Sequence, residues 1–199
     1  MENKQLRIGC VVMAAGNARR FGENKLAAVF QGRSLLQRAL EAVPAEKLGP
    51  VAVVTQYPEA AALARGFGFR PVRNPHPDWG ISYTIRLGLE ALGPCDGALF
   101  LVSDQPLLRR EAVAALVDAF RARPDALAAL GHNGVRGNPC LFPARFFPEL
   151  RSLTEDQGGS TVIRRHQEEL VLVEVPACQL EDVDEPQALL ALGRGDALV

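Results

Sequence analysis

The chain has 199 residues, 48% of them hydrophobic, and its 22 basic and 23 acidic residues leave a formal net charge of −1 at pH 7. This length and apolar content predict one substantial core, and so a single domain over residues 1–199. The basic residues are scattered along the chain, which excludes nucleic acid and anionic membranes as expected partners. No apolar run approaches the roughly 20 residues that a membrane-spanning helix needs.

The cysteines and the start of the sequence bear on the compartment. Cys10, Cys95, Cys140 and Cys178 form no C-x-x-C pair, and two of them fall in expected strands. The first residues, Met-Glu-Asn-Lys, lack the long apolar stretch of a signal peptide. We therefore expect a cytoplasmic protein with reduced thiols.

The apolar pattern alternates between short strands and amphipathic helices. Strands are expected at residues 7–13, 50–55, 69–73, 97–103 and 127–130. Helices are expected at residues 34–43, 59–66, 82–92 and 110–122, followed by mixed elements that end in a helix at 186–192. This alternation predicts an α/β three-layer sandwich, in which helices cover both faces of a mainly parallel sheet.

The first motif is the run VVMAAGNARRFGENK, where an expected strand enters a turn of small residues followed by cations. The small side chains leave backbone N–H groups open to a ligand, and an arginine and a lysine supply two kinds of phosphate contact. The segment therefore predicts a triphosphate site. Its candidate nucleotide-binding residues are Ala14, Ala15, Gly16, Arg20, Gly22 and Lys25.

Two common phosphate motifs do not fit this run. A P-loop needs Lys and Ser/Thr directly after its second glycine, whereas Gly22 is followed by Glu-Asn-Lys-Leu. The dinucleotide fingerprint needs three glycines at fixed offsets, and this turn has two. The run therefore predicts a longer loop that wraps its ligand.

The loop resembles the signature of the nucleotidyltransferases with a glycosyltransferase-A-like fold, in which Ala-Ala-Gly, an Arg, a Gly and a Lys recur at this spacing. Within that superfamily, AAGNARRFGENKL is most similar to the molybdenum cofactor cytidylyltransferases. The resemblance implies one nucleotidyltransferase domain with Mg²⁺ as cofactor. It also implies CTP and a molybdenum-bound pterin as substrates, and a molybdenum hydroxylase as a candidate partner.

The second motif, ALFLVSDQPLL at residues 98–108, ends an apolar strand at Asp104. Open α/β sheets bind ligands at the carboxyl ends of their strands, so Asp104 is expected across from the phosphate loop as an oxygen ligand for Mg²⁺. Taken alone, the segment fits an Asp-Pro turn that caps the next helix better. The family resemblance favours the metal, because it places a metal-binding Asp in this Asp-Gln-Pro segment.

The third motif is LEDVDEPQAL at residues 180–189. In an alternating strand, Asp182 and Asp184 point to the same side, where they repel each other unless a cation or donor lies between them. Resemblance to the family's Asp-x-Asp-x-Pro ending assigns the second metal carboxylate to Asp184. A helix N-cap is the alternative for either residue.

A further nucleotide contact is expected at the start of helix 82–92. Ser82 is the predicted N-cap, which leaves the backbone amides around Gly80 to Ser82 pointing out of the helix. The related enzymes place nucleotide contacts near this glycine. The chain departs from the family's Ser-rich pattern at Tyr83 and Thr84, which bears on the choice of nucleotide.

The acceptor is expected to bind two later segments. Gly137-Asn138-Pro139 resembles the family's Gly-His/Asn-Pro element, and Asp156 and Gln157 fall in one that resembles its Asp-Gln-Gly element. The side chains of Asn138, Asp156 and Gln157 offer donors and acceptors to a pterin. The alternative for this region is a solvated, capped helix.

Together these parts predict transfer of CMP from CTP to the phosphate of the pterin cofactor, with release of pyrophosphate. Arg20, Lys25 and Asp104 are the predicted catalytic residues, because phosphoryl chemistry depends on positioning and on charge neutralisation.

CTP is inferred from resemblance, since relatives that use GTP tend to carry Gly-Gly where this chain has Ala14-Ala15. A GTP-using guanylyltransferase, a sugar-phosphate nucleotidyltransferase and a non-enzymatic carrier of the cofactor remain alternatives.

Overall fold

A seven-stranded sheet in the order β5-β4-β1-β6-β8-β7-β9 runs through the computed structural model, which describes residues 6–16 and 24–194. Every neighbouring pair is parallel except the two that β8 makes with β6 and β7. The strands are β1 (Ile8–Ala14), β4 (Val51–Thr55), β5 (Arg70–Arg73), β6 (Gly97–Val102), β7 (Leu127–His132), β8 (Val135–Pro143) and β9 (Leu170–Glu174). A separate hairpin pairs β2 (Val29–Phe30) with β3 (Arg33–Ser34).

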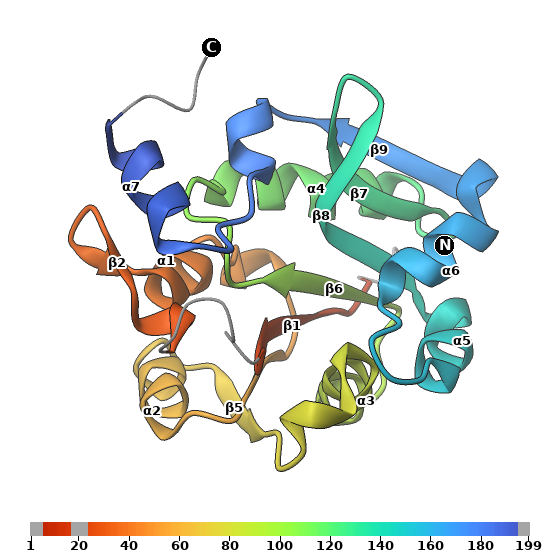
Figure 1. Cartoon of the computed structure of the whole chain (residues 1–199). Helices are drawn as coiled ribbons and strands as arrows, with labels where there is room; N and C mark the ends of the chain where they lie inside the picture. The colour runs from red at the N-terminus through yellow and green to blue at the C-terminus, as the bar shows by residue number, and fades with distance from the viewer. Residues whose placement is uncertain (1–5, 17–23, 195–199) are drawn as a thin grey trace.

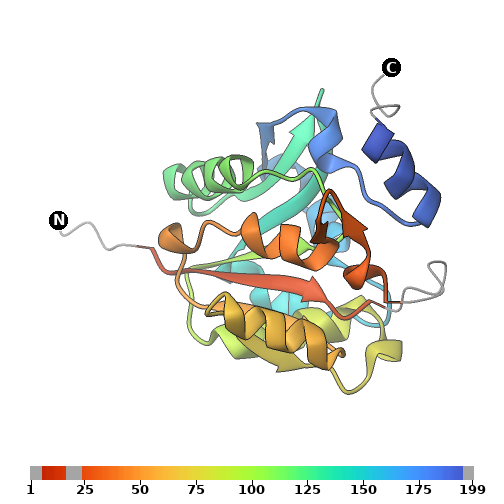
Figure 2. The ribbon, with the colours of Figure 1, turned by 90° about the vertical axis from the view of Figure 1, so that its left-hand side faces the viewer.

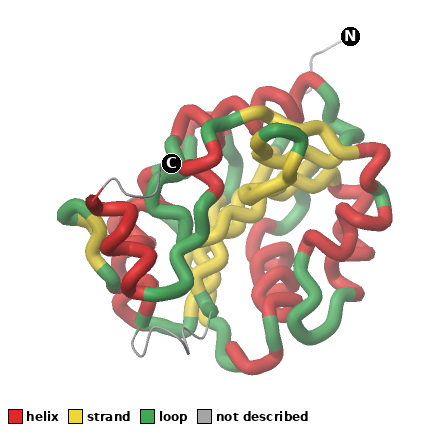
Figure 3. The backbone as a smooth tube through the Cα atoms, turned by 45° about the horizontal axis from the view of Figure 1, so that its top comes forward, coloured by secondary structure: helices red, strands yellow, loops and turns green. Residues whose placement is uncertain are grey.

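Helices cover both faces of the sheet (Figure 1). One face carries α1 (Leu35–Glu41), α2 (Pro58–Gly66) and α4 (Arg110–Ala122), which Figure 2 brings to the front. The other carries α3 (Ile81–Leu92), α5 (Phe147–Ser152) and α6 (Gly159–Arg165). Strands lie between two sets of helices in Figure 3, so the predicted three-layer α/β architecture is confirmed.

The remaining helical segments are short or late in the chain. The helix α7 (Pro186–Arg194) follows the last strand. The 3₁₀ turns are η1 (Lys25–Ala27), η2 (Ala45–Lys47), η3 (Pro77–Trp79), η4 (Ala144–Phe146), η5 (Gln167–Glu169) and η6 (Ala177–Leu180). Within the described residues, no helix has both the length and the apolar character that crossing a membrane requires.

The central strand β1 shows why this sequence builds a sheet with two cores. Its register pairs it in parallel with β4 on one side and β6 on the other. Ile8, Cys10 and Val12 are buried in the core under α1, α2 and α4, whereas Val11 points into the core under α3. Strands buried on both faces read as continuous apolar runs, which is how this segment appears in the sequence.

The antiparallel strand β8 arises from a tight hairpin. Asn133 and Gly134, with φ of 49° and 77°, form the two-residue connection between the paired residues His132 and Val135. Asn-Gly is the preferred sequence for such a turn, because both positions need positive φ. The chain therefore turns back beside β7, and β8 enters the sheet between β6 and β7.

The predicted N-cap at Ser82 is wrong. The helix α3 begins at Ile81, with Gly80 as its N-cap at φ 81°, and the side chain of Ser82 is fully buried. The backbone N–H of Ser82 donates to the carbonyl of Glu155 at 3.1 Å. A Cβ on Gly80 would lie 2.3 Å from that carbonyl group, so the approaching loop requires glycine and replaces a side-chain cap.

The helix α3 lies unusually close to β1, because Gly88 faces Val11. A Cβ built on Gly88 would lie 2.4 Å from Cγ1 of the buried Val11 side chain. Neither the β-branched side chain nor the strand beneath it has room to move away. This contact fixes the separation of helix and strand, whose ends both border the cavity described below.

We predict that Gly88→Ala lowers the free energy of unfolding by about 1–3 kcal/mol through overpacking against Val11. The matched control is Gly66→Ala at the end of α2, where an added Cβ meets nothing within 4 Å. Ala there is neutral or stabilising by up to about 1 kcal/mol, through helix propensity. Denaturant unfolding of the two variants measures both values, and equal effects would contradict this account of the packing.

Candidate active site

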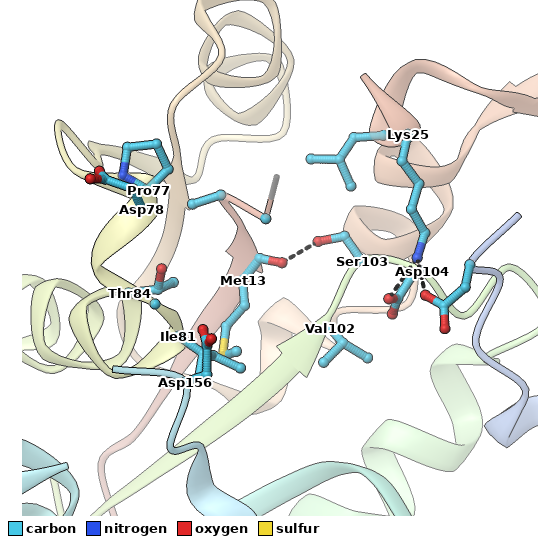
Figure 4. A pocket seen from close by; sticks show the side chains of 15 residues that line it. Met13, Lys25, Pro77, Asp78, Ile81, Thr84, Val102, Ser103, Asp104 and Asp156 are labelled. Atoms are coloured by element: carbon cyan, nitrogen blue, oxygen red, sulfur yellow. Dashed lines mark hydrogen bonds and ion pairs between the residues drawn. The ribbon is translucent and has the colours of Figure 1, made fainter. Parts of the chain in front are cut away.

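A cavity of about 560 Å³ opens at the carboxyl ends of β1 and β6, beside the start of α3. Figure 4 shows Lys25 and Asp104 on one side of it, and Pro77, Asp78 and Thr84 on the other. Asp156 comes into the same cavity from the loop that precedes α6. Segments far apart in the sequence therefore meet where an open α/β sheet is expected to bind its ligand.

Lys25 lies between two of the predicted metal carboxylates. Its Nζ is 3.0 Å from Oδ2 of Asp104 and 3.0 Å from Oδ1 of Asp184 (Figure 4). The Lys25 side chain is 13% exposed, against 66% for Asp184. The other oxygen of Asp104, Oδ1, is buried and has no hydrogen-bond partner among the described residues.

A third carboxylate, that of Asp182, lies close to this group. Burial raises the pKa of Asp182 to about 6, and the negative charges of Asp104 and Asp184 act in the same direction. A hydrogen bond from Gln105 and the positive charge of Lys25 oppose the rise. One ammonium thus contacts two carboxylates with a third nearby, so the group carries excess negative charge and offers the hard oxygen atoms that a divalent cation prefers.

The segment that carries Asp184 is held against the loop after β6. The backbone N–H of Val183 donates to the carbonyl of Asp104 at 2.9 Å, and Nε2 of Gln105 donates to the carbonyl of Leu180 at 3.1 Å. The alternating strand predicted around Asp182 and Asp184 is wrong, because residues 181–184 are irregular and join no sheet. These single hydrogen bonds bring the carboxylates together in place of a strand ladder.

The predicted phosphate loop is described only in part. Ala14 ends β1 and is buried, whereas Ala15 and Gly16 line the cavity. Two residues that the sequence analysis did not single out support them: Nε2 of Gln56 donates to the Ala15 carbonyl at 3.0 Å, and the Tyr57 hydroxyl donates to that of Gly16 at 3.3 Å. The predicted residues Arg20 and Gly22 lie outside the described residues.

The start of α3 contributes Gly80, Ile81 and Thr84 to the cavity wall, but the buried Ser82 is not part of it. Thr84 accepts a hydrogen bond at 3.2 Å from Nδ2 of the buried Asn74. Two features of the sequence could have indicated this pair of residues. They are the Asn-Pro dipeptide directly after β5 and the departure at Thr84 from the family's serine-rich pattern.

The three predicted acceptor residues separate in space. Asp156 lines the main cavity, and Asn138 lines a second, smaller cavity. Gln157 is exposed and lines neither cavity, since its Oε1 accepts from the backbone N–H of Thr154 at 3.2 Å within its own turn. The structure therefore brings Asp156 to the predicted nucleotide site and leaves Gln157 outside it.

Several known proteins resemble this chain in sequence or in fold. The chain is 26% identical over 191 residues to purine catabolism protein PucB of Bacillus subtilis (strain 168), a span of 89% of this chain and 91% of the relative. Rv0371c from Mycobacterium tuberculosis H37Rv superposes with a TM-score of 0.80 at 20% identity, over 96% of this chain and 100% of the other. Rv0371c in complex with manganese gives a TM-score of 0.75 at 21% identity, over 94% and 98%.

The nucleotidyl transferase Mth528 from Methanothermobacter thermautotroptrophicus has a TM-score of 0.78 at 20% identity, over 95% of this chain and 97% of the other. The family profile of the MobA-like NTP transferase domain matches residues 10–170. Because this match takes in most of the chain, the protein belongs to the family of MobA-like NTP transferase domains and is a nucleotidyltransferase.

Proposed function

We propose that the protein is a Mg²⁺-dependent cytidylyltransferase, which transfers CMP from CTP to the phosphate of a molybdenum-bound pterin and releases pyrophosphate. The observation that carries this proposal is the contact of Lys25 with Asp104 and Asp184 at the mouth of the main cavity. One ammonium and two carboxylates thus lie beside Ala15 and Gly16 of the predicted triphosphate loop. The manganese in the complex of Rv0371c supports a divalent cation in this fold.

In the proposed reaction, an acceptor phosphate oxygen bonds to the α-phosphorus of CTP while the bond to pyrophosphate breaks in line. Asp104 and Asp184 would hold the Mg²⁺, which neutralises charge on the phosphate oxygens when bound. With its carboxylate partners engaged by the metal, Lys25 would donate to phosphate oxygens. The small side chains of Ala15 and Gly16, which line the cavity, would let the same oxygens approach the backbone N–H groups of these two residues.

The proposed substrates, CTP and a pterin, are inferred from residues near the carboxylates and the phosphate loop. The small pair Ala14-Ala15 favours CTP over GTP by resemblance to the cytidylyltransferases. Asn138 and Asp156, which line adjoining cavities, offer a hydrogen-bonding edge to a pterin acceptor. A molybdenum hydroxylase is the proposed recipient of the product.

Binding of CTP with Mg²⁺ is expected to stabilise the fold more than GTP, ATP or UTP. A ligand at a hundred times its dissociation constant stabilises by roughly 2.7 kcal/mol. For a domain of this size, each kcal/mol raises Tm by about 2–4 °C. Thermal unfolding with each nucleotide, with and without Mg²⁺, measures the effect. A rise with GTP alone indicates a guanylyltransferase, and no response to any nucleotide favours the carrier.

Asp104→Asn is predicted to remove turnover by a factor on the order of 10²–10³, because it removes a ligand charge that acts in the transition state. The same change should abolish the Mg²⁺-dependent part of the CTP stabilisation. Asp118→Asn is the control, since Asp118 pairs with Lys47 on a surface remote from the cavity. Pyrophosphate release and thermal unfolding provide the two readouts, and undiminished turnover in Asp104→Asn would exclude the proposed metal site.

Lys25→Met tests two effects of the ammonium, its competition with a metal ion for the carboxylates and its contact with the triphosphate. Without nucleotide the variant should bind Mn²⁺ more tightly than the wild type, because no internal cation competes for Asp104 and Asp184. With CTP present, its thermal stabilisation should be smaller, because the triphosphate loses a cationic donor. Paramagnetic resonance of free Mn²⁺ measures the first effect, with Lys47→Met as the charge-matched control. Weaker Mn²⁺ binding by Lys25→Met in the absence of nucleotide would contradict the competition.

A further inference from the structure

A second cavity of about 200 Å³ adjoins the main one, and the walls of the two share Met13, Ile81 and Val102. Its floor is apolar and includes two aromatic rings, those of Phe100 and Phe142, which meet edge to face at 5.7 Å between centroids. An enclosed aromatic floor of this kind suits a flat ring system.

The polar wall of this cavity comes from one strand. Arg136, Asn138, Cys140 and Phe142 of β8 all line the cavity, although the register of β8 with β7 shifts between Arg136 and Cys140. β8 lies between β6 and β7 in Figure 1, and its register pairs Cys140 with Phe100 of β6. Ser160 of α6 completes the polar side.

Arg136 has no acidic partner within residues 6–16 and 24–194, which the structure describes. Its Nη1 lies 3.3 Å from the carbonyl of Gly137 and 3.3 Å from Sγ of Cys140, and no carboxylate of the described residues forms a salt bridge with it. Among the described residues that line the two cavities, the other cation is Lys25, which two carboxylates neutralise. A partly buried guanidinium retains most of its five donors for an anion that reaches it.

The geometry points to Arg136 as a specificity-determining residue of the acceptor subsite: the second cavity receives a planar ring, and Arg136 binds a negatively charged group on it that is separate from the reacting phosphate. This inference rests on the proposed function in treating the ring as part of the acceptor. The shared wall allows one acceptor to place its phosphate in the main cavity while its ring enters the second cavity, which Phe100 and Phe142 help to line. Asn138 then hydrogen-bonds the edge of the same ring.

The test compares two fluorescent probes, pterin-6-carboxylate and unsubstituted pterin, which differ in the negative charge. Binding is followed by fluorescence titration with the full chain and its variants Arg136→Ala and Arg136→Lys. The control is Arg123→Ala, which removes an exposed arginine at the end of α4. The ratio of the two affinities is the readout, because a loss of folded protein lowers the apparent binding of both probes equally.

The wild type and Arg123→Ala should bind pterin-6-carboxylate at least about tenfold more tightly than pterin, as expected for a hydrogen-bonded charge pair. Arg136→Ala should bind both probes about equally. Arg136→Lys should keep part of the preference, because an ammonium keeps the charge without the bidentate geometry. The inference is overturned if Arg136→Ala keeps the wild-type ratio, or if the wild type binds neither probe.

Thermal stabilisation by CTP with Mg²⁺, measured on the same variants, separates this inference from the proposed function. It should be unchanged in Arg136→Ala if the second cavity holds the acceptor, whereas a loss would place the nucleotide there and overturn the inference. The two readouts can also disagree. If the preference for the charged probe depends on Arg136 but no nucleotide raises the thermal stability, the subsite is supported and the cytidylyltransferase is rejected.

Discussion

The double contact of Lys25 with Asp104 and Asp184 is the interaction on which the organisation of this site depends. It joins η1, the loop after β6 and the segment before α7, which have no strand ladder in common. Without a positive charge between them, the carboxylates of Asp104 and Asp184 would repel each other, and Oδ2 of Asp104 would lose the hydrogen bond that Lys25 donates. The same carboxylates are the proposed metal ligands. Their negative charge is therefore neutralised by Lys25 in the free protein and by the proposed metal ion when it binds.

The reversed direction of β8 determines which residues line the second cavity. A parallel sheet presents the carboxyl ends of its strands at one edge, and there β1 and β6 carry the phosphate loop and Asp104. The antiparallel β8 instead lays one face along the neighbouring cavity, so that Arg136, Asn138 and Cys140 line its wall. One sheet thereby borders both the proposed phosphate site and the proposed ring subsite.

Up to residue 130, each predicted strand and helix lies within two residues of an observed element, because each carries a clear apolar period. The short hairpin of β2 and β3 was not predicted. It failed where tertiary contacts decide local structure: the carbonyl of Glu155 replaces the expected cap at Ser82, and hydrogen bonds to the Asp104 loop replace the strand expected at Asp182. The start of β8 directly after the hairpin was not predicted, because Arg136 to Pro139 interrupts its apolar pattern, although Asn133-Gly134 marks the turn. Which cations lack acidic partners is a property of the folded chain, and no local pattern indicates it.

Lys25 and Asp184 are separated by 159 positions in the sequence, which has a consequence for the nascent protein. At ribosomal rates, that interval of synthesis lasts roughly 8–30 s. During this time β1, β4, β5 and β6 are already available to pair, whereas the carboxylate cluster lacks its last members. The growing chain can therefore pair the first four strands of its sheet before the carboxylate cluster of the proposed metal site is complete.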